Sequence, residues 1–141
     1  MDIVYKCGTV SMDFERVADM LSQAYWSRGI RREEIKKAAD NSALVIGAFS
    51  EEGRQIAYGR VISDKTRFAY LTDFYVDTEF RNKGICRKMV ELVLAHPDLA
   101  DVYQWLLVTG DAHGLYEKCG FKIIARPLDF MEIRSPRPKD R

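Results

Sequence analysis

The sequence predicts a single α/β domain of the α+β kind, with about four helices around a mixed, mostly antiparallel sheet of about seven strands. Its 141 residues are enough for one hydrophobic core. Along the chain, the apolar pattern alternates between helical spacing and the short apolar runs of strands. These changes give the order strand, two helices, three strands, helix, strand, helix and two strands.

The N-terminal part predicts one strand and two helices. Residues 3–5 form the short apolar strand, and Ser11 is the expected N-cap of the first helix. The apolar face of this helix has helical spacing and consists of Phe14, Val17, Ala18, Leu21 and Tyr25. Residues 31–39 predict the second helix.

Short turns join three consecutive strands in the middle of the chain. The strands are expected at residues 43–49, 55–62 and 67–76, with turns at residues 51–54 and 63–66. Neighbouring strands that are joined by such short turns run antiparallel. The sequence therefore predicts an antiparallel meander.

The remaining elements follow from Gly84. A helix begins there and ends before Pro97, because the residue before a proline is pushed out of helical geometry. Residues 105–108 predict a strand that helices cover on both faces, since its apolar run is continuous. Residues 111–118 predict a short helix.

Two final strands are expected at residues 121–125 and 128–133, where they would complete the sheet. The domain is then predicted to span residues 1–134. Residues 135–141 are polar, basic and interrupted by proline, which predicts a flexible tail.

Composition narrows the function classes. Lys plus Arg is 22 and Asp plus Glu is 21, giving a formal net charge of +1. This near-neutrality argues against binding to nucleic acid or to an anionic membrane as the main function. No apolar stretch is long enough for a transmembrane helix, and residues 1–6 lack the pattern of a signal peptide. We expect a cytoplasmic protein.

Cysteines and histidines are few and widely spaced. The three cysteines are Cys7, Cys86 and Cys119, and the two histidines are His96 and His113. No local pattern groups them into a zinc site or a Cys/His catalytic pair, so we expect no metal and reduced, apolar cysteines.

A basic junction between a strand and a helix predicts an anion site. The strand ends at Val76, the helix begins at Gly84, and the basic residues around this glycine are Arg81, Lys83, Arg87 and Lys88. The first backbone N–H groups of a helix have no partners inside the helix and lie at its positive end, so they suit phosphate. A solvated basic helix start is the alternative.

The pattern of this junction is neither a Walker loop nor a Rossmann fingerprint, because both need further glycines. Residues 81–86, Arg-Asn-Lys-Gly-Ile-Cys, fit Arg/Gln-x-x-Gly-x-Gly/Ala instead. They resemble the pyrophosphate loop of the GNAT N-acetyltransferases. Cys86 stands where that family usually has Gly or Ala.

Residues 109–121 resemble the family's later motif, Asn-x-x-Ala-x-x-x-Tyr-x-Lys-x-Gly-Phe. The matching positions are Ala112, Tyr116, Lys118, Gly120 and Phe121, while Thr109 replaces the usual Asn. The resemblance covers residues 3–133 and is strongest to small, single-domain microbial members.

The resemblance implies that acetyl-CoA binds as cosubstrate in a cleft where two central parallel strands, residues 68–76 and 103–108, splay apart. Backbone groups of Phe74, Tyr75 and Val76 would pair with pantetheine. The pyrophosphate would lie on Arg81, Asn82, Lys83, Gly84, Ile85, Cys86 and Arg87. Thr109, Ala112 and Tyr116 would complete the cofactor site.

The resemblance also implies catalytic roles. The Val76 N–H would stabilise the oxyanion, and Tyr116 would protonate the leaving thiolate, unless it only packs against Phe121. Asp73 is the candidate base, water relay or site for a cationic substrate, with a purely structural carboxylate as the alternative. Strand alternation places Asp73 and Tyr75 on one face, and Phe74 and Val76 on the other.

The acceptor pocket is expected around Tyr25 and Trp26, which could equally close the end of the core. The predicted function is transfer of an acetyl group from acetyl-CoA to a primary amine of a small molecule or peptide, by direct attack in a ternary complex. One alternative is a non-catalytic acyl-CoA sensor or interaction module. The other is an enzyme that uses a longer acyl chain or an oxygen acceptor. A homodimer is left open beside a monomer.

Overall fold

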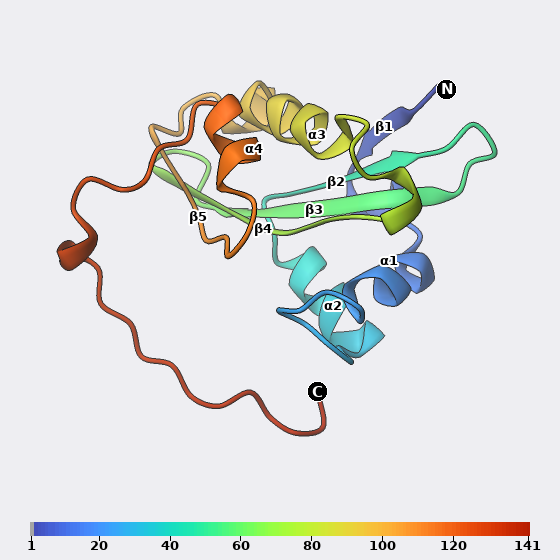
Figure 1. Cartoon of the computed structure of the whole chain (residues 1–141), viewed down its shortest axis with the longest axis horizontal. Coiled ribbons are helices and arrows are strands. Elements are labelled where there is room, and N and C mark those ends of the chain that lie inside the picture. Colours follow the sequence, from blue (N-terminus) through green and yellow to red (C-terminus); the bar gives the residue numbers. More distant parts are fainter. Residues whose placement is uncertain (1) are drawn as a thin grey trace.

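A five-stranded mixed sheet separates two helical layers (Figure 1). The computed structural model describes residues 2–141. Its strands and helices are, in chain order, β1 (Val4–Cys7), α1 (Phe14–Leu21), α2 (Arg32–Asp40), β2 (Leu44–Phe49), β3 (Gln55–Ser63), β4 (Phe68–Val76), α3 (Ile85–Leu94), β5 (Gln104–Leu107) and α4 (His113–Lys118). Helices α1 and α2 cover one face, and α3 and α4 cover the other.

The sheet has the order β1-β2-β3-β4-β5. The meander predicted for β2, β3 and β4 is confirmed, because both neighbouring pairs are antiparallel. Strand β1 adds antiparallel to β2, and β5 adds parallel to β4. The parallel pairing joins only Phe68–Leu71 to Gln104–Leu107, so β4 continues to Val76 beyond the end of β5.

Two apolar cores lie on the two faces of the sheet. Between the sheet and α3, the buried helix residues are Ile85, Met89, Val90 and Val93. On the opposite face, the helix residues Val17, Met20, Leu21, Ile35 and Ala39 pack against the sheet residues Val45, Phe49, Tyr58 and Tyr75. This division of apolar faces is what the spacing of the sequence predicts for α1 and α3.

A β-bulge interrupts β4 at the point where the strand approaches the site. In the pairing of β3 with β4, Arg60 pairs with Thr72 and Tyr58 pairs with Tyr75. The single residue between them on β3, Gly59, therefore faces two residues on β4, Asp73 and Phe74. The backbone of Asp73 is left-handed, with φ 59°. As a result Asp73 and Tyr75 lie toward α1 while Phe74 lies toward α3, in agreement with the predicted separation.

The prediction of about seven strands is wrong. Within residues 2–141 the sheet has five, because residues 121–125 and 128–133 form no strand and contain only the 3-10 turn Pro127–Asp129. Neither segment pairs with a sheet edge. Consequently β5 is an edge strand with β4 next to it, rather than both lying at the centre of the sheet, and the side chains of β5 are half-buried instead of covered on both faces.

Two smaller expectations at the first helix are also corrected. The N-cap of α1 is Asp13, whose carboxylate accepts the Arg16 N–H at 3.2 Å, whereas Ser11 belongs to the 3-10 turn Thr9–Ser11. Helix α1 ends at Leu21, so Tyr25 lies in the following loop. The four predicted helices are otherwise confirmed. None of the helices within residues 2–141 has the length and hydropathy needed to cross a bilayer.

Candidate functional site

A cleft of about 700 Å³ opens between the end of β4, the start of α3, helix α4 and the loop between α1 and α2. It brings together most residues that the sequence singles out. Those lining the cleft are Tyr25, Trp26, Phe74, Tyr75, Val76, Arg81, Asn82, Gly84, Ile85, Cys86, Ala112 and Tyr116. Because these residues come from four separate segments, the fold itself assembles the cleft.

Four predicted residues do not line the cleft: Asp73, Lys83, Arg87 and Thr109. The Arg87 guanidinium lies 3.7 Å from Glu91 on the same helix. The Thr109 hydroxyl accepts the Ala112 N–H at 3.0 Å and so closes the turn that leads into α4. Conversely, the structure adds lining residues that were not assigned to the site: Gln23, Ala24, Arg28, Thr78, Phe80, Asp111 and Leu115.

Of these additions, Thr78 and Phe80 had a usable signal, since they lie between the end of the strand and the basic loop. Gln23 and Ala24 had none. They reach the cleft because the loop after α1 folds back, where the Ser27 hydroxyl donates a hydrogen bond to the Leu21 carbonyl at 2.6 Å. The sequence pattern of this loop does not predict where the loop folds back onto the rest of the structure.

The last residues of β4 present main-chain groups to the cleft. Pairing with β5 stops at Leu71, and beyond it the β5-facing edge of β4 has no neighbouring strand in residues 2–141. The Val76 carbonyl accepts a hydrogen bond from Arg81 Nε at 2.9 Å, and the guanidinium lies over the Tyr75 ring, 5.1 Å from its centroid. An extended amide-containing ligand could therefore add to this edge as a strand would.

The start of α3 presents unpaired N–H groups to the same cleft. Gly84 has φ 78°, and within the described chain no side chain caps this helix. The first N–H paired within the helix is that of Lys88, which donates to the Gly84 carbonyl at 3.0 Å. The preceding N–H groups, of Ile85, Cys86 and Arg87, are thus free for an anion, and a phosphate fits such a helix start.

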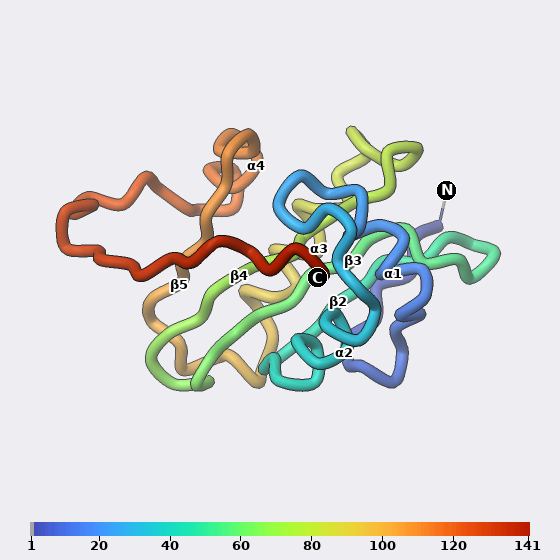
Figure 2. Tube along the Cα trace, turned by 90° about the horizontal axis from the view of Figure 1, so that it is seen from below, coloured from blue at the N-terminus to red at the C-terminus, as the bar shows by residue number. Residues whose placement is uncertain are grey.

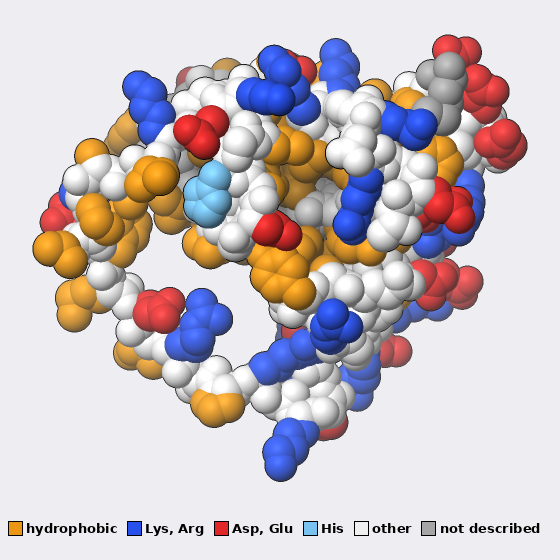
Figure 3. Space-filling view, in the orientation of Figure 1, with side chains coloured by type: hydrophobic (Ala, Val, Ile, Leu, Met, Phe, Trp, Pro, Cys, Tyr) orange, Lys and Arg blue, Asp and Glu red, His pale blue; other side chains and the backbone are white. Residues whose placement is uncertain are grey.

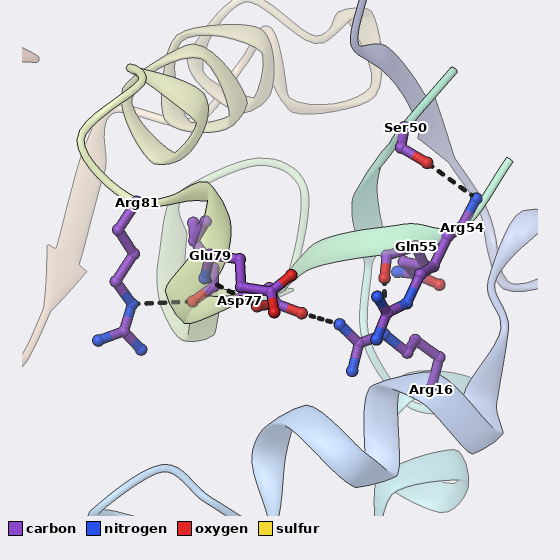
Figure 4. A network of polar contacts seen from close by, with 8 residues as sticks. Arg16, Ser50, Arg54, Gln55, Asp77, Glu79 and Arg81 are labelled. Carbon is purple, nitrogen blue, oxygen red and sulfur yellow. Dashed lines mark hydrogen bonds and ion pairs between the residues drawn. The ribbon is translucent and has the colours of Figure 1, made fainter. Parts of the chain in front are cut away.

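A buried polar network holds the turn between β4 and α3 (Figure 4). Arg16 on α1 pairs with the Asp77 carboxylate, and its Nε donates to the Gln55 carbonyl at 2.9 Å. Asp77 also accepts the Glu79 N–H at 3.0 Å. Burial raises the pKa of Asp77, but the Glu79 N–H and the Arg16 guanidinium outweigh it and hold that pKa below its usual range.

Tyr116 on α4 and Cys86 on α3 both line the cleft and lie close enough for each to influence the pKa of the other. Burial raises the pKa of Tyr116, and it raises the pKa of Cys86 to about 11. Both groups are therefore protonated at neutral pH. The Tyr116 ring also packs edge-on against Phe121, with centroids 6.0 Å apart. The position of Tyr116 is therefore compatible both with the role of proton donor and with a packing role.

Asp73 has both carboxylate oxygens engaged. One accepts the indole N–H of Trp26 at 3.0 Å, and the other accepts Arg60 Nε at 2.7 Å. The Trp26 ring in turn packs edge-on against Tyr75, with centroids 6.3 Å apart. Asp73 is largely buried and connects to the cleft through Trp26 rather than by lining it.

Tyr25 extends from the loop after α1 to the loop before α4. Its hydroxyl accepts the Gly110 N–H at 3.2 Å, and its ring meets Trp26 edge-on at 5.0 Å. The two aromatics therefore form one wall of the cleft beside the end of β4.

Comparison with known proteins agrees with this geometry. A model of the acetyltransferase (GNAT) domain matches residues 40–123. A solved structure from Xanthomonas campestris pv. campestris, assigned to the GNAT family, has a TM-score of 0.89 and 36% identity, covering 96% of this chain and 95% of that chain.

Two further matches are more distant. A predicted acetyltransferase from Clostridium acetobutylicum, solved with acetyl-CoA, has a TM-score of 0.64 and 16% identity over 94% of this chain and 96% of that one, which is a likeness of fold. The glucosamine 6-phosphate N-acetyltransferase of Arabidopsis thaliana is 28% identical over 97 residues, or 64% of this chain. That match spans 65% of the length of the plant protein.

Proposed function

Because this chain belongs to the GNAT family of acetyltransferases, we propose that it transfers the acetyl group of acetyl-CoA to a primary amine of a small molecule or peptide. The amine attacks directly in a ternary complex. The observation that carries the proposal is one cleft that joins a free strand edge, an uncapped helix start and a half-buried tyrosine.

The chain's own residues divide the binding between two surfaces. The N–H groups at the start of α3, with Arg81, Asn82 and Gly84 beside them, would hold the pyrophosphate. The main chain from Phe74 to Val76 would pair with the amides of pantetheine. Lys83 and Arg87 lie outside the cleft lining, so we assign them a longer-range attraction to phosphate charge.

Bound acetyl-CoA supplies the thioester whose carbonyl carbon the amine attacks. The Val76 N–H, at the end of β4, would stabilise the negative charge that develops on the carbonyl oxygen. The bulge at Asp73 and Phe74 supports this role, because it sets the direction of the last strand residues. A fixed N–H in a partly enclosed cleft needs no reorganisation when that charge appears.

Tyr116 would donate the proton that the departing thiolate needs. The hydroxyl keeps its proton at neutral pH, which the role requires, while the burial that raises its pKa makes it a weaker acid than an exposed tyrosine. The Cys86 thiol lies beside this hydroxyl in the cleft, and the departing thiolate would be a stronger hydrogen-bond acceptor than that neutral thiol.

Asp73 has two proposed roles. As a direct base, Asp73 would take the proton of the amine on an oxygen that already accepts a hydrogen bond, because Trp26 engages one oxygen and Arg60 the other. These contacts support a positioning role, in which Asp73 orients the indole of Trp26 beside the acceptor amine. Tyr25 and Trp26 would then form the acceptor pocket.

We further propose that residues 1–134 form the catalytic domain and that residues 135–141 are a flexible basic tail. All three cysteines are free in the described chain. This fits a reducing compartment, so we propose a cytoplasmic location.

The test is release of free thiol from acetyl-CoA across a panel of amines that includes amino acids, polyamines, peptides and amino sugars. Glucosamine 6-phosphate belongs in the panel because the plant relative is named for it. We expect turnover with at least one acceptor and little with the Tyr116→Phe variant. Tight binding of CoA without thiol release from any amine would instead favour the acyl-CoA sensor.

A further inference from the structure

Two side chains of opposite charge line the cleft without an ionic partner. Arg28 lies in the loop between α1 and α2, Asp111 lies in the loop before α4, and both are exposed. Within residues 2–141 neither forms an ion pair, with the other or with a further group. The remaining charged residue of the lining, Arg81, is engaged by the Val76 carbonyl. The described lining therefore offers a ligand one free cationic group and one free anionic group.

A hydrogen bond joins the two loops that carry these charges. The Tyr25 hydroxyl accepts the Gly110 N–H at 3.2 Å. Arg28 follows the tyrosine by three residues, and Asp111 follows the glycine directly. Seen from below, the loop between α1 and α2 lies between α4 and the turn that leads into α3 (Figure 2). Arg28 and Asp111 therefore belong to the same end of the cleft.

Asp111 also lies near the proposed proton donor. Burial is the main cause of the raised pKa of Tyr116, and the negative charge of Asp111 adds to it, so the carboxylate lies near that hydroxyl. The acceptor nitrogen must approach the same thioester whose sulfur Tyr116 would protonate. The described lining contains no other acidic residue, and both oxygens of the more deeply placed Asp73 are engaged. Asp111 is therefore the carboxylate that an ammonium group would meet in the cleft.

The surroundings of these charges favour a ligand that carries both signs. Figure 3 shows hydrophobic side chains in a hollow beside α4, with side chains of both charges around it. Apolar walls that limit the access of water strengthen the attraction between opposite charges. An acceptor with an ammonium group alone would leave Arg28 without a partner, and a second cationic group on the acceptor would be repelled by Arg28.

We propose that the acceptor is a primary amine that also carries an anionic group, either a carboxylate or a phosphate; this inference rests on the acetyl transfer proposed above. Asp111 receives the ammonium group, and Arg28 receives the anion. The amine attacks as the free base, so one proton passes from the ammonium nitrogen to the exposed Asp111 carboxylate and on to water. This frees the nitrogen lone pair for the carbonyl carbon of the thioester. Arg28 and Asp111 thus determine acceptor specificity.

The test measures thiol release from saturating acetyl-CoA with acceptors of matched length. The anionic amines are β-alanine, γ-aminobutyrate, ε-aminocaproate and O-phosphoethanolamine. Their counterparts are neutral alkylamines and ethanolamine, and diamines of the same length. The variants are Arg28→Gln and Asp111→Asn. The matched controls are Arg31→Gln and Asp101→Asn, which change exposed residues outside the cleft lining.

We expect kcat/KM to be about 10–100-fold higher for at least one anionic amine than for its neutral counterpart, which is the range that a hydrogen bond to a charged group provides. The diamine should be the poorest acceptor of the three. Arg28→Gln is expected to remove most of this preference, whereas Asp111→Asn should lower kcat/KM for every amine, chiefly by raising KM. Both controls should keep wild-type kinetics.

Three results would overturn the proposal. The first is equal kcat/KM for the anionic, neutral and cationic amines. The second is an Arg28→Gln variant that keeps the wild-type preference and binds acetyl-CoA more weakly, because Arg28 would then serve the cofactor. The third is an Asp111→Asn variant with the kinetics of its Asp101→Asn control.

Calorimetry separates this proposal from the acetyl transfer on which it rests. With CoA bound, the wild type is expected to bind an anionic amine more tightly than the neutral counterpart, and Arg28→Gln and Asp111→Asn should each bind it more weakly. That pattern without thiol release from any amine would contradict acetyl transfer and support the recognition of both charges. Thiol release without any preference for anionic amines would support acetyl transfer and overturn this proposal, and so would the absence of both binding and release.

Discussion

Tyr116 on α4 and Cys86 in the first turn of α3 lie next to one another inside the cleft, where each affects the pKa of the other. The Gly or Ala that usually stands at this motif position has no side-chain acceptor. In this chain the substituted residue therefore contacts the proposed proton donor itself. Burial raises both pKa values, so neither group is ionised at neutral pH and the thiol places no charge beside the hydroxyl.

Tyr116→Phe removes this hydroxyl and keeps the ring that packs on Phe121. Because general acid catalysis contributes about 10²–10⁴-fold, we expect kcat to fall by that factor while the Kd for acetyl-CoA hardly changes. Since the pKa of Tyr116 is raised, wild-type activity should not decline through mildly alkaline pH from loss of this proton. The measurements are kcat over pH and calorimetry, with Tyr103→Phe, at an exposed tyrosine, as control. Turnover within about threefold of wild type would remove Tyr116 as the acid.

Cys86→Ala removes the thiol that lies beside the Tyr116 hydroxyl. We expect a loss of about 1 kcal/mol in the free energy of unfolding and a decrease in kcat, because the half-buried hydroxyl loses its polar neighbour. Cys86→Ser, which restores a polar neighbour, should recover part of both. Denaturant unfolding and steady-state kinetics on the two variants test this prediction. An equal free energy of unfolding and an equal kcat for the Ala and Ser variants would mean that the contact does not position Tyr116.

Gly59→Ala tests the bulge that shapes the cleft. A Cβ at Gly59 would lie 2.6 Å from the Phe74 ring, so the ring must move. We expect a loss of about 1–3 kcal/mol in the free energy of unfolding and weaker acetyl-CoA binding. The control is Gly114→Ala in α4, where a Cβ would meet no atom within 4 Å and should stabilise the helix slightly. Equal stability of the two variants in denaturant would contradict the close approach of Gly59 and Phe74.

Asp77→Asn tests the network below the cleft. Because the pKa of Asp77 is lowered in the folded state, the ionised carboxylate stabilises the fold above its ordinary pKa, and that stability disappears as pH falls through the folded pKa. We expect the variant to lose about 1.5–3 kcal/mol at neutral pH and to approach wild type in acid. The control is Glu91→Gln, which breaks an exposed pair with Arg87. A pH-independent difference in unfolding free energy would exclude the charge of Asp77 as its cause.

Local patterns predicted the four helices, the five strands that the sheet contains and much of the cleft lining, but also two C-terminal strands that do not form within residues 2–141. The apolar faces of α1 and α3 and the short turns around β3 depend on neighbouring residues, and these predictions are confirmed. The basic loop from Arg81 and the motif containing Tyr116 are also contiguous in sequence. Their residues meet in one cleft because β4 and β5 run parallel.

The remaining features depend on contacts between distant residues. The hydrogen bonds between Tyr25 and Gly110 and between Trp26 and Asp73 join segments that are far apart in the sequence. The spacing of apolar residues within one segment does not predict such contacts. The bulge opposite Gly59 likewise needs the partner strand. The segment at residues 128–133 has a strand pattern, but a strand also needs an edge to pair with, and its own chain does not bring one to it.

Calorimetric titration with acetyl-CoA tests the central claim most directly, by comparing the wild type with Gly84→Glu and Gly53→Glu. Both glycines have positive φ and open space for a Cβ, so both variants carry the same added charge and backbone strain, but only Gly84 lies at the start of α3. We predict that the wild type and Gly53→Glu bind acetyl-CoA and that folded Gly84→Glu does not, because a carboxylate would repel the pyrophosphate. Undiminished affinity in folded Gly84→Glu, or no binding by the wild type, would contradict the assignment of this cleft to acetyl-CoA.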